Sequence, residues 1–94
     1  MKYEVLKVPV DSLKEFPDNP RDSNIEPIKE SIKQHGQYRP LTVNKNTNEI
    51  LTGNHTWLAM KELGMKECTA MFVDVDEVTA KKIVLVDNRA NELA

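Results

Sequence analysis

Residues 50–64 read ILTGNHTWLAMKELG, which is the pattern of a strand end, a glycine turn and an amphipathic helix. The first apolar residues predict the strand, and Gly53 predicts the turn. A helix is expected over residues 56–63, because Gly64 is a common kind of helix stop. A helix that starts after such a turn presents backbone N–H groups at the positive end of its dipole. These groups suit an anion such as phosphate.

Short polar residues follow the turn. Asn54, His55 and Thr56 are candidate phosphate contacts together with Gly53. His55 is also the candidate catalytic base, because imidazole titrates near neutral pH. The structural alternative is that Asn54 or Thr56 only caps the helix, and from these residues alone both interpretations stay open. Trp57, in the first turn, is expected to pack in the core rather than to stack on a base.

The chain has 94 residues, of which 39% are hydrophobic and 30% charged, as is typical of one soluble globular domain. It contains no apolar run of about 18 residues and no apolar signal core, so neither a membrane span nor secretion is expected. A single cysteine, Cys68, excludes an internal disulfide and fits a cytoplasmic protein. Cys68 lies in an apolar segment and is expected to pack rather than react.

The formal net charge is −2 at pH 7. Non-specific DNA affinity comes from neutralisation of phosphates by lysine and arginine, so this charge argues against a general nucleic-acid face. A local basic patch remains compatible with it. The histidines and the cysteine lie too far apart in sequence to match the spacing of a zinc site, and no metal site is predicted from them.

The periodic segments on both sides complete the fold prediction. In chain order they are a strand at 3–10, a helix capped by Ser23 or Asn24 and ended by Gly36, hairpin strands at 41–43 and 49–51, the helix at 56–63, a strand at 67–73 and a helix at 78–91. This order, β–α–β–β–α–β–α, predicts an α+β domain with a small mixed β-sheet and packed helices. One shared core is expected from the inward-facing residues Ile28, Ile32, Leu41, Val43, Leu51, Leu58, Leu63, Phe72, Ile83 and Val84.

Segments along the whole chain resemble the ParB/sulfiredoxin-like superfamily. Residues 16–21, FPDNPR, are similar to the first box of ParB-type N-terminal domains, and residues 25–43 to the helix, glycine stop, proline and strand that follow it. Residues 53–59 fall where that family has a Gly-Glu-Arg-Arg box and where sulfiredoxin has a Gly-Cys-His-Arg loop. Residues 87–94 resemble the closing helix of ParB-like domains associated with DNA methyltransferases. The resemblance implies a ParB/sulfiredoxin-like fold over residues 1–94, either as a stand-alone protein or as a domain cut from a longer chain.

The resemblance also implies ligands. In ParB-type proteins, arginines near these boxes lie close to the phosphates of a nucleotide, which makes Arg21 the best candidate side-chain ligand here and Arg39 the second. The alternative is that both are solvated surface arginines. The implied cofactor is CTP or ATP with Mg²⁺. The acidic residues that could hold the Mg²⁺ beside the phosphates are Asp18, Asp22, Asp87 and Glu92.

The chain departs from both families at the second box. Asn54, His55 and Thr56 replace the glutamate and arginines that serve CTP and its hydrolysis in ParB, so the donors remain but the charges are lost. Binding with slow or absent turnover is therefore expected. Sulfiredoxin chemistry is excluded, because Asn54 stands where that mechanism needs a thiolate.

The sequence therefore predicts a nucleotide- or phosphate-binding, ParB-like domain that acts in DNA transactions such as partition, modification or phage DNA handling. DNA is expected to be contacted through an additional domain or partner, since no helix-turn-helix segment follows, and no membrane contact is expected. The sequence does not predict an oligomeric state. One alternative is a DNA nuclease or nucleotide hydrolase with His55 as base. Another is a protein-interaction module without a ligand.

Overall fold

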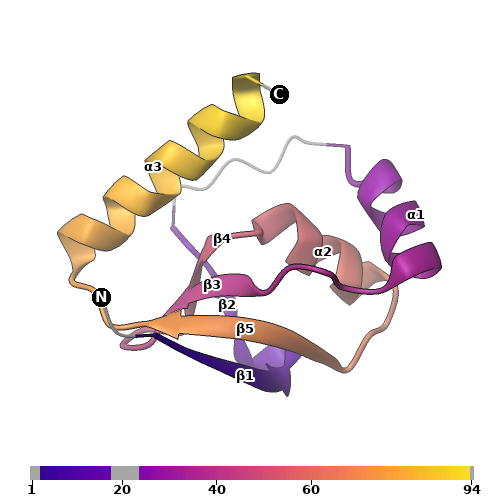
Figure 1. Ribbon diagram of the computed structural model, residues 1–94, viewed down its shortest axis with the longest axis horizontal. Helices are drawn as coiled ribbons and strands as arrows, with labels where there is room; N and C mark the ends of the chain where they lie inside the picture. Colours follow the sequence, from indigo (N-terminus) through magenta and orange to yellow (C-terminus); the bar gives the residue numbers. More distant parts are fainter. Residues whose placement is uncertain (1–2, 18–23, 94) are drawn as a thin grey trace.

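The computed structural model describes residues 3–17 and 24–93, and the side chains of this range up to residue 87. Within it, a mixed five-stranded sheet has the order β1-β5-β3-β4-β2 and carries three α-helices (Figure 1). The elements are β1 (Tyr3–Pro9), a 3-10 turn η1 (Val10–Ser12), β2 (Lys14–Glu15), α1 (Glu26–His35), β3 (Leu41–Asn44), β4 (Glu49–Thr52), α2 (Asn54–Glu62), β5 (Glu67–Val73) and α3 (Glu77–Leu93). The predicted α+β class is confirmed.

The sheet combines antiparallel and parallel pairs. β5 pairs antiparallel with β1 and parallel with β3, and β3 forms the predicted antiparallel hairpin with β4. The hairpin loop is held by the buried Asn44, whose Oδ1 accepts the backbone N–H of Asn46 at 3.0 Å. The short edge strand β2 pairs parallel with β4 and was not predicted. Its two residues, Lys14 and Glu15, are too few to show an alternating pattern.

Glycines end the first two helices as predicted. Gly36 follows α1 with a φ of 73°, and Gly64 lies just beyond α2 with a φ of 75°. The predicted cap at Asn24 is wrong by one residue, because Ile25 is the N-cap of α1 and makes no side-chain cap bond. The Oδ1 of Asn24 accepts the backbone N–H of Glu26 at 3.1 Å just before the helix. Residues 18–23, including the other predicted cap, Ser23, lie outside the described residues.

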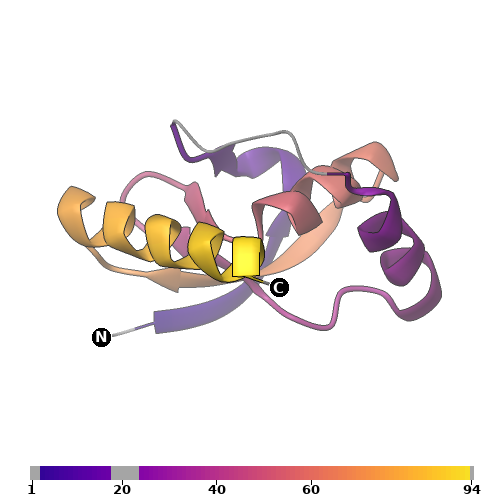
Figure 2. The same ribbon diagram turned by 90° about the horizontal axis from the view of Figure 1, so that it is seen from above.

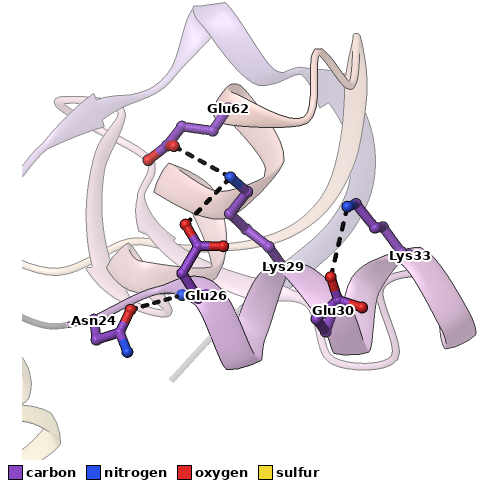
Figure 3. A network of polar contacts seen from close by, with 6 residues as sticks. All are labelled: Asn24, Glu26, Lys29, Glu30, Lys33 and Glu62. Carbon is purple, nitrogen blue, oxygen red and sulfur yellow. Dashed lines mark hydrogen bonds and ion pairs between the residues drawn. The ribbon is translucent and has the colours of Figure 1, made fainter.

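The helices lie in two groups. α1 packs against α2, and α3 contacts β4 (Figures 1 and 2). The Nζ of Lys29, on α1, lies 3.6 Å from a carboxylate oxygen of Glu26 and 3.4 Å from one of Glu62 on α2 (Figure 3). The Lys29 side chain is only 18% exposed, so its methylene stem packs between the two helices. No helix in the described part of the chain is long and apolar enough to cross a membrane.

The prediction of one shared core is wrong, because the sheet buries residues on both faces. Ile50 belongs to a cluster beneath α1 and α2, whereas its neighbour Leu51 belongs to a second cluster with Val84 of α3. Successive residues of a strand point to opposite faces, and both faces of β4 are covered by helices. The predicted residues Ile28, Ile32, Leu41, Val43, Leu58, Leu63 and Phe72 fall in the first cluster, and Leu51, Ile83 and Val84 in the second.

The buried face of α2 is centred on Trp57. Trp57 and Met60 are buried, while the predicted core residue Leu58 is only partly buried. The indole Nε1 of Trp57 donates to the backbone oxygen of Val10 at 2.9 Å, which ties α2 to the turn after β1. The expectation that Trp57 is a core residue is confirmed. Cys68 is buried as expected, and burial raises the pKa of its thiol, so it packs rather than reacts.

Candidate functional site

A cavity of about 400 Å³ lies at the start of α2. Its walls are formed by one side of α1, the loop between α1 and β3, the turn between β4 and α2, and one residue of α3. The predicted residues Arg39, Gly53, Asn54, His55 and Thr56 all line it. The structure therefore brings together in one cavity every predicted phosphate ligand that it describes. The remaining one, Arg21, lies outside the described residues, and its approach to this cavity stays a prediction.

The N-terminus of α2 opens on this cavity. Gly53 precedes the helix in the left-handed conformation, with φ 86° and ψ 22°, and no side chain in the described part of the chain caps it. The hydrogen-bond ladder begins with the Trp57 N–H, which donates to the Gly53 oxygen at 3.0 Å. The predicted start at Thr56 is wrong by two residues, because α2 already begins at Asn54. The alternative in which Asn54 or Thr56 caps the helix is also wrong.

Two polar atoms of the first helical turn are buried without partners among the described residues. They are the Oδ1 of Asn54 and the Nε2 of His55. Asn54 is buried, and its Nδ2 faces the Glu15 carboxylate at 3.5 Å, which orients Oδ1 away from Glu15. A buried polar atom without a hydrogen bond costs about 1–3 kcal/mol. Unpaired buried polar atoms are rare in folded proteins, and both of these belong to residues that line the cavity.

Asp87 brings a carboxylate from α3 to the same place. It lines the cavity and accepts the backbone N–H of Gly53. Burial raises the pKa of the Asp87 carboxyl, and the Gly53 N–H and the nearby His55 only partly oppose this effect. Asp87 is the one carboxylate among the described residues that line the cavity. The sequence had suggested it only as a magnesium ligand. Its contact with Gly53, 34 positions earlier, has no local sequence signal.

Replacement of Asp87 with asparagine is expected to remove a pH-dependent part of the stability. The folded protein binds the Asp87 proton more tightly than the unfolded chain does, because the folded pKa is raised. The contribution of this group to the unfolding free energy is therefore highest at acidic pH and decreases as the pH rises through the folded pKa. Asparagine keeps an oxygen for the Gly53 N–H but carries no charge.

Denaturant unfolding of both proteins between about pH 4 and pH 7 measures this difference. Asp87→Asn should gain stability relative to the wild type as the pH rises. A difference that does not change with pH would show that the Asp87 carboxyl does not titrate abnormally in the fold.

The loop that carries Arg39 is attached to β5 by a glutamine. The side-chain Nε2 of Gln37 donates to the backbone oxygens of Arg39 at 2.8 Å and of Thr69 at 2.9 Å, and its Oε1 accepts the Thr69 N–H at 2.8 Å. Arg39 itself is exposed at the rim of the cavity, where its guanidinium carbon lies 5.9 Å from the centroid of the Tyr38 ring. Sequence reasoning missed Gln37, because its partner Thr69 is distant in sequence.

No group of three or more histidine, cysteine, aspartate or glutamate side chains in the described part of the chain could hold a metal ion. Asp18 and Asp22 lie outside that part, and the side chain of Glu92 is not described. Of the four predicted magnesium ligands, Asp87 is thus the one whose side chain is described, and it lines the cavity.

The sequence matches the family model described as the ParB N-terminal domain over residues 1–89. The chain is 36% identical over 93 residues to the chromosome-partitioning protein ParB of Myxococcus xanthus, covering 93% of this chain and 31% of that protein. It is 26% identical over 97 residues to a nucleoid occlusion protein of Oceanobacillus iheyensis, covering 95% of this chain and 34% of that protein. The chain thus spans about a third of the length of these relatives.

Solved structures share the fold. A C-terminally truncated ParB from Caulobacter crescentus, complexed with CTP-gamma-S, superposes with a TM-score of 0.76 at 24% identity, covering 90% of this chain and 52% of that one. The same protein complexed to the centromeric parS site gives a TM-score of 0.68 at 25% identity, covering 88% of this chain and 46% of that one. These structures support the fold independently of the sequence match.

Proposed function

Because the chain belongs to the ParB N-terminal domain family, we propose that the cavity at the start of α2 binds the triphosphate of a nucleotide. The observation that carries this proposal is the uncapped N-terminus of α2, which opens on a cavity that it shares with an arginine. Backbone N–H groups at a helix start and a guanidinium are both donors that suit phosphate oxygens. The volume of about 400 Å³ is within the range of small-molecule sites.

In this proposal each site residue has a role. The backbone around Asn54, His55 and Thr56 offers donors to the phosphates after the Gly53 turn, and Arg39 adds positive charge from the rim. Arg21 is proposed as a second guanidinium ligand. If Mg²⁺ accompanies the triphosphate, Asp87 is the described residue placed to hold it, since Mg²⁺ commonly binds one or two carboxylates together with phosphate oxygens.

CTP is the proposed nucleotide, with ATP as the competitor to be tested. The support for CTP is the Caulobacter crescentus ParB structure, which contains CTP-gamma-S. Binding with slow or absent turnover is proposed, because the loop that follows Gly53 offers an amide, an imidazole and a hydroxyl rather than an acid and arginines. Hydrolysis with His55 as base remains the alternative, since His55 lines the cavity together with Asp87.

We propose that this nucleotide site acts in a DNA transaction of the partition type. The transaction takes place in the bacterial cytoplasm and belongs to a bacterial or a phage DNA-handling system. The support is the match to chromosome-partitioning and nucleoid occlusion proteins and to a ParB complexed to parS. The net charge of −2 argues against a general DNA-binding face but is compatible with a local basic patch. DNA contact is therefore proposed to involve a further segment or a partner, and the nucleotide to act on that contact from within this domain.

Replacement of Arg39 with alanine should weaken CTP binding about tenfold. A tenfold loss corresponds to about 1.4 kcal/mol, near the lower end of the range for hydrogen bonds to charged groups, as suits an exposed side chain. Calorimetric titration with CTP, ATP and GTP, with and without Mg²⁺, measures the nucleotide affinity of the wild type and its loss in the variant. Lys66→Ala is the matched control, because it removes an exposed positive charge that does not line the cavity. Equal losses in both variants would contradict a specific role for Arg39.

A further inference from the structure

Tyr38 is displayed outward in a loop whose neighbouring residues are fixed. Its side chain is 75% exposed, the largest exposure among the large hydrophobic residues described. It also lines the cavity at the start of α2, on the same rim as Arg39. A tyrosine can bury about 150–250 Å² of surface, so a rigid loop that leaves the ring in solvent gives up a large packing contribution.

The rigidity of this loop comes from the residue before Tyr38. Both hydrogens of the Gln37 amide are used, one on the Arg39 oxygen and one on the Thr69 oxygen, and its Oε1 accepts the Thr69 N–H. The bond from Gln37 to Arg39 closes a small ring around Tyr38, and the bonds to Thr69 fix this ring to β5. The backbone on both sides of Tyr38 is thereby held, and its ring is directed to the rim of the cavity.

We propose that Tyr38 is the stacking surface for the base of a nucleotide whose phosphates lie at the start of α2, and that Gln37 is the positioning residue that presents it. This inference rests on the proposed function and adds to it the residue that binds the base of the nucleotide. The Arg39 guanidinium beside the ring places a phosphate-binding charge next to the aromatic surface.

Stacking on an aromatic ring tolerates different bases, because every base has a π-face. Tyr38 should therefore contribute to the binding of CTP and ATP alike and leave discrimination between them to other contacts. An inorganic triphosphate has no base and should not use Tyr38. This difference separates a stacking role from a general effect of the loop on the phosphate site.

The test compares CTP, ATP and inorganic triphosphate in calorimetric titrations of the wild type, Tyr38→Ala and Tyr38→Phe. Tyr38→Ala should weaken CTP and ATP about five- to 150-fold, the effect of losing one stacked base, and leave inorganic triphosphate unchanged. Tyr38→Phe keeps the ring and should bind all probes like the wild type. Unchanged nucleotide binding by Tyr38→Ala, or an equal loss for inorganic triphosphate, would overturn the inference.

Gln37 is tested by a double-mutant cycle. Gln37→Ala should weaken CTP, and this loss should become smaller in the Tyr38→Ala background, because Gln37 acts on the base through Tyr38. A loss of the same size in both backgrounds would overturn the positioning role. If the wild type binds CTP but Tyr38→Ala binds it equally well, the inference alone fails. If the wild type binds neither nucleotides nor inorganic triphosphate, the proposed function fails and the inference fails with it.

Discussion

Replacement of Trp57 with alanine is expected to lower the unfolding free energy by about 3–5 kcal/mol, as for other large core aromatics. The indole is 4% exposed and lies in the larger hydrophobic cluster. Its Nε1 also donates to the backbone oxygen of Val10, so the substitution removes a buried hydrogen bond as well as leaving a cavity, and the Val10 oxygen keeps only the longer bond from the Leu13 N–H at 3.4 Å. Trp57 is the only tryptophan of the chain, so the variant has no tryptophan fluorescence. Its urea unfolding is therefore followed by circular dichroism.

Trp57→Phe separates the two contributions. Phenylalanine keeps most of the packing but cannot donate to Val10, and this variant should lose about 1–3 kcal/mol. A loss below about 1 kcal/mol for Trp57→Ala would contradict the core position, because surface substitutions have effects of that size or less.

Gly53→Ala should destabilise the fold for two reasons. The φ of 86° is in the left-handed region, which costs about 1–2 kcal/mol for a residue with a Cβ. The added Cβ would also lie 2.7 Å from the Cδ2 of Leu41, a buried core residue, and such overpacking costs about 1–3 kcal/mol more. Thermal or denaturant unfolding measures the sum.

Gly64→Ala is the matched control for this prediction. Gly64 has a similar φ of 75°, but an added Cβ would meet nothing within 4 Å. It should therefore show only the cost of the left-handed conformation, and the difference between the two variants isolates the contact with Leu41. Equal destabilisation would show that the turn before α2 is not packed against β3 as described.

The sequence determined the local parts of the fold well. The stops at Gly36 and Gly64 follow from the conformational freedom of glycine, and the hairpin follows from a polar loop between two apolar segments. β2 is too short to give a periodic signal. The two-sided burial of Ile50 and Leu51 depends on α3 packing on the second face, which a pair of apolar residues does not reveal.

The candidate site likewise has residues that could be predicted from the sequence and residues that could not. Gly53 to Thr56 are contiguous, so their position at a helix start could be predicted from the order of residues. Asp87 reaches Gly53 from α3, and Gln37 reaches Thr69 from the loop after α1. These contacts are set by the tertiary packing and have no spacing rule in the sequence. Arg21 remains a prediction from the family resemblance.

The most direct test of the nucleotide site is a ¹H–¹⁵N NMR titration of the protein with CTP and Mg²⁺. The account predicts that the amide resonances of Gly53, Asn54, His55 and Thr56 shift first and furthest, together with the Arg39 amide at the rim of the same cavity. Lys66 lies outside the cavity, and its amide should stay unchanged. Unshifted amides at the start of α2 under saturating CTP, or shifts confined to another surface, would contradict the proposal.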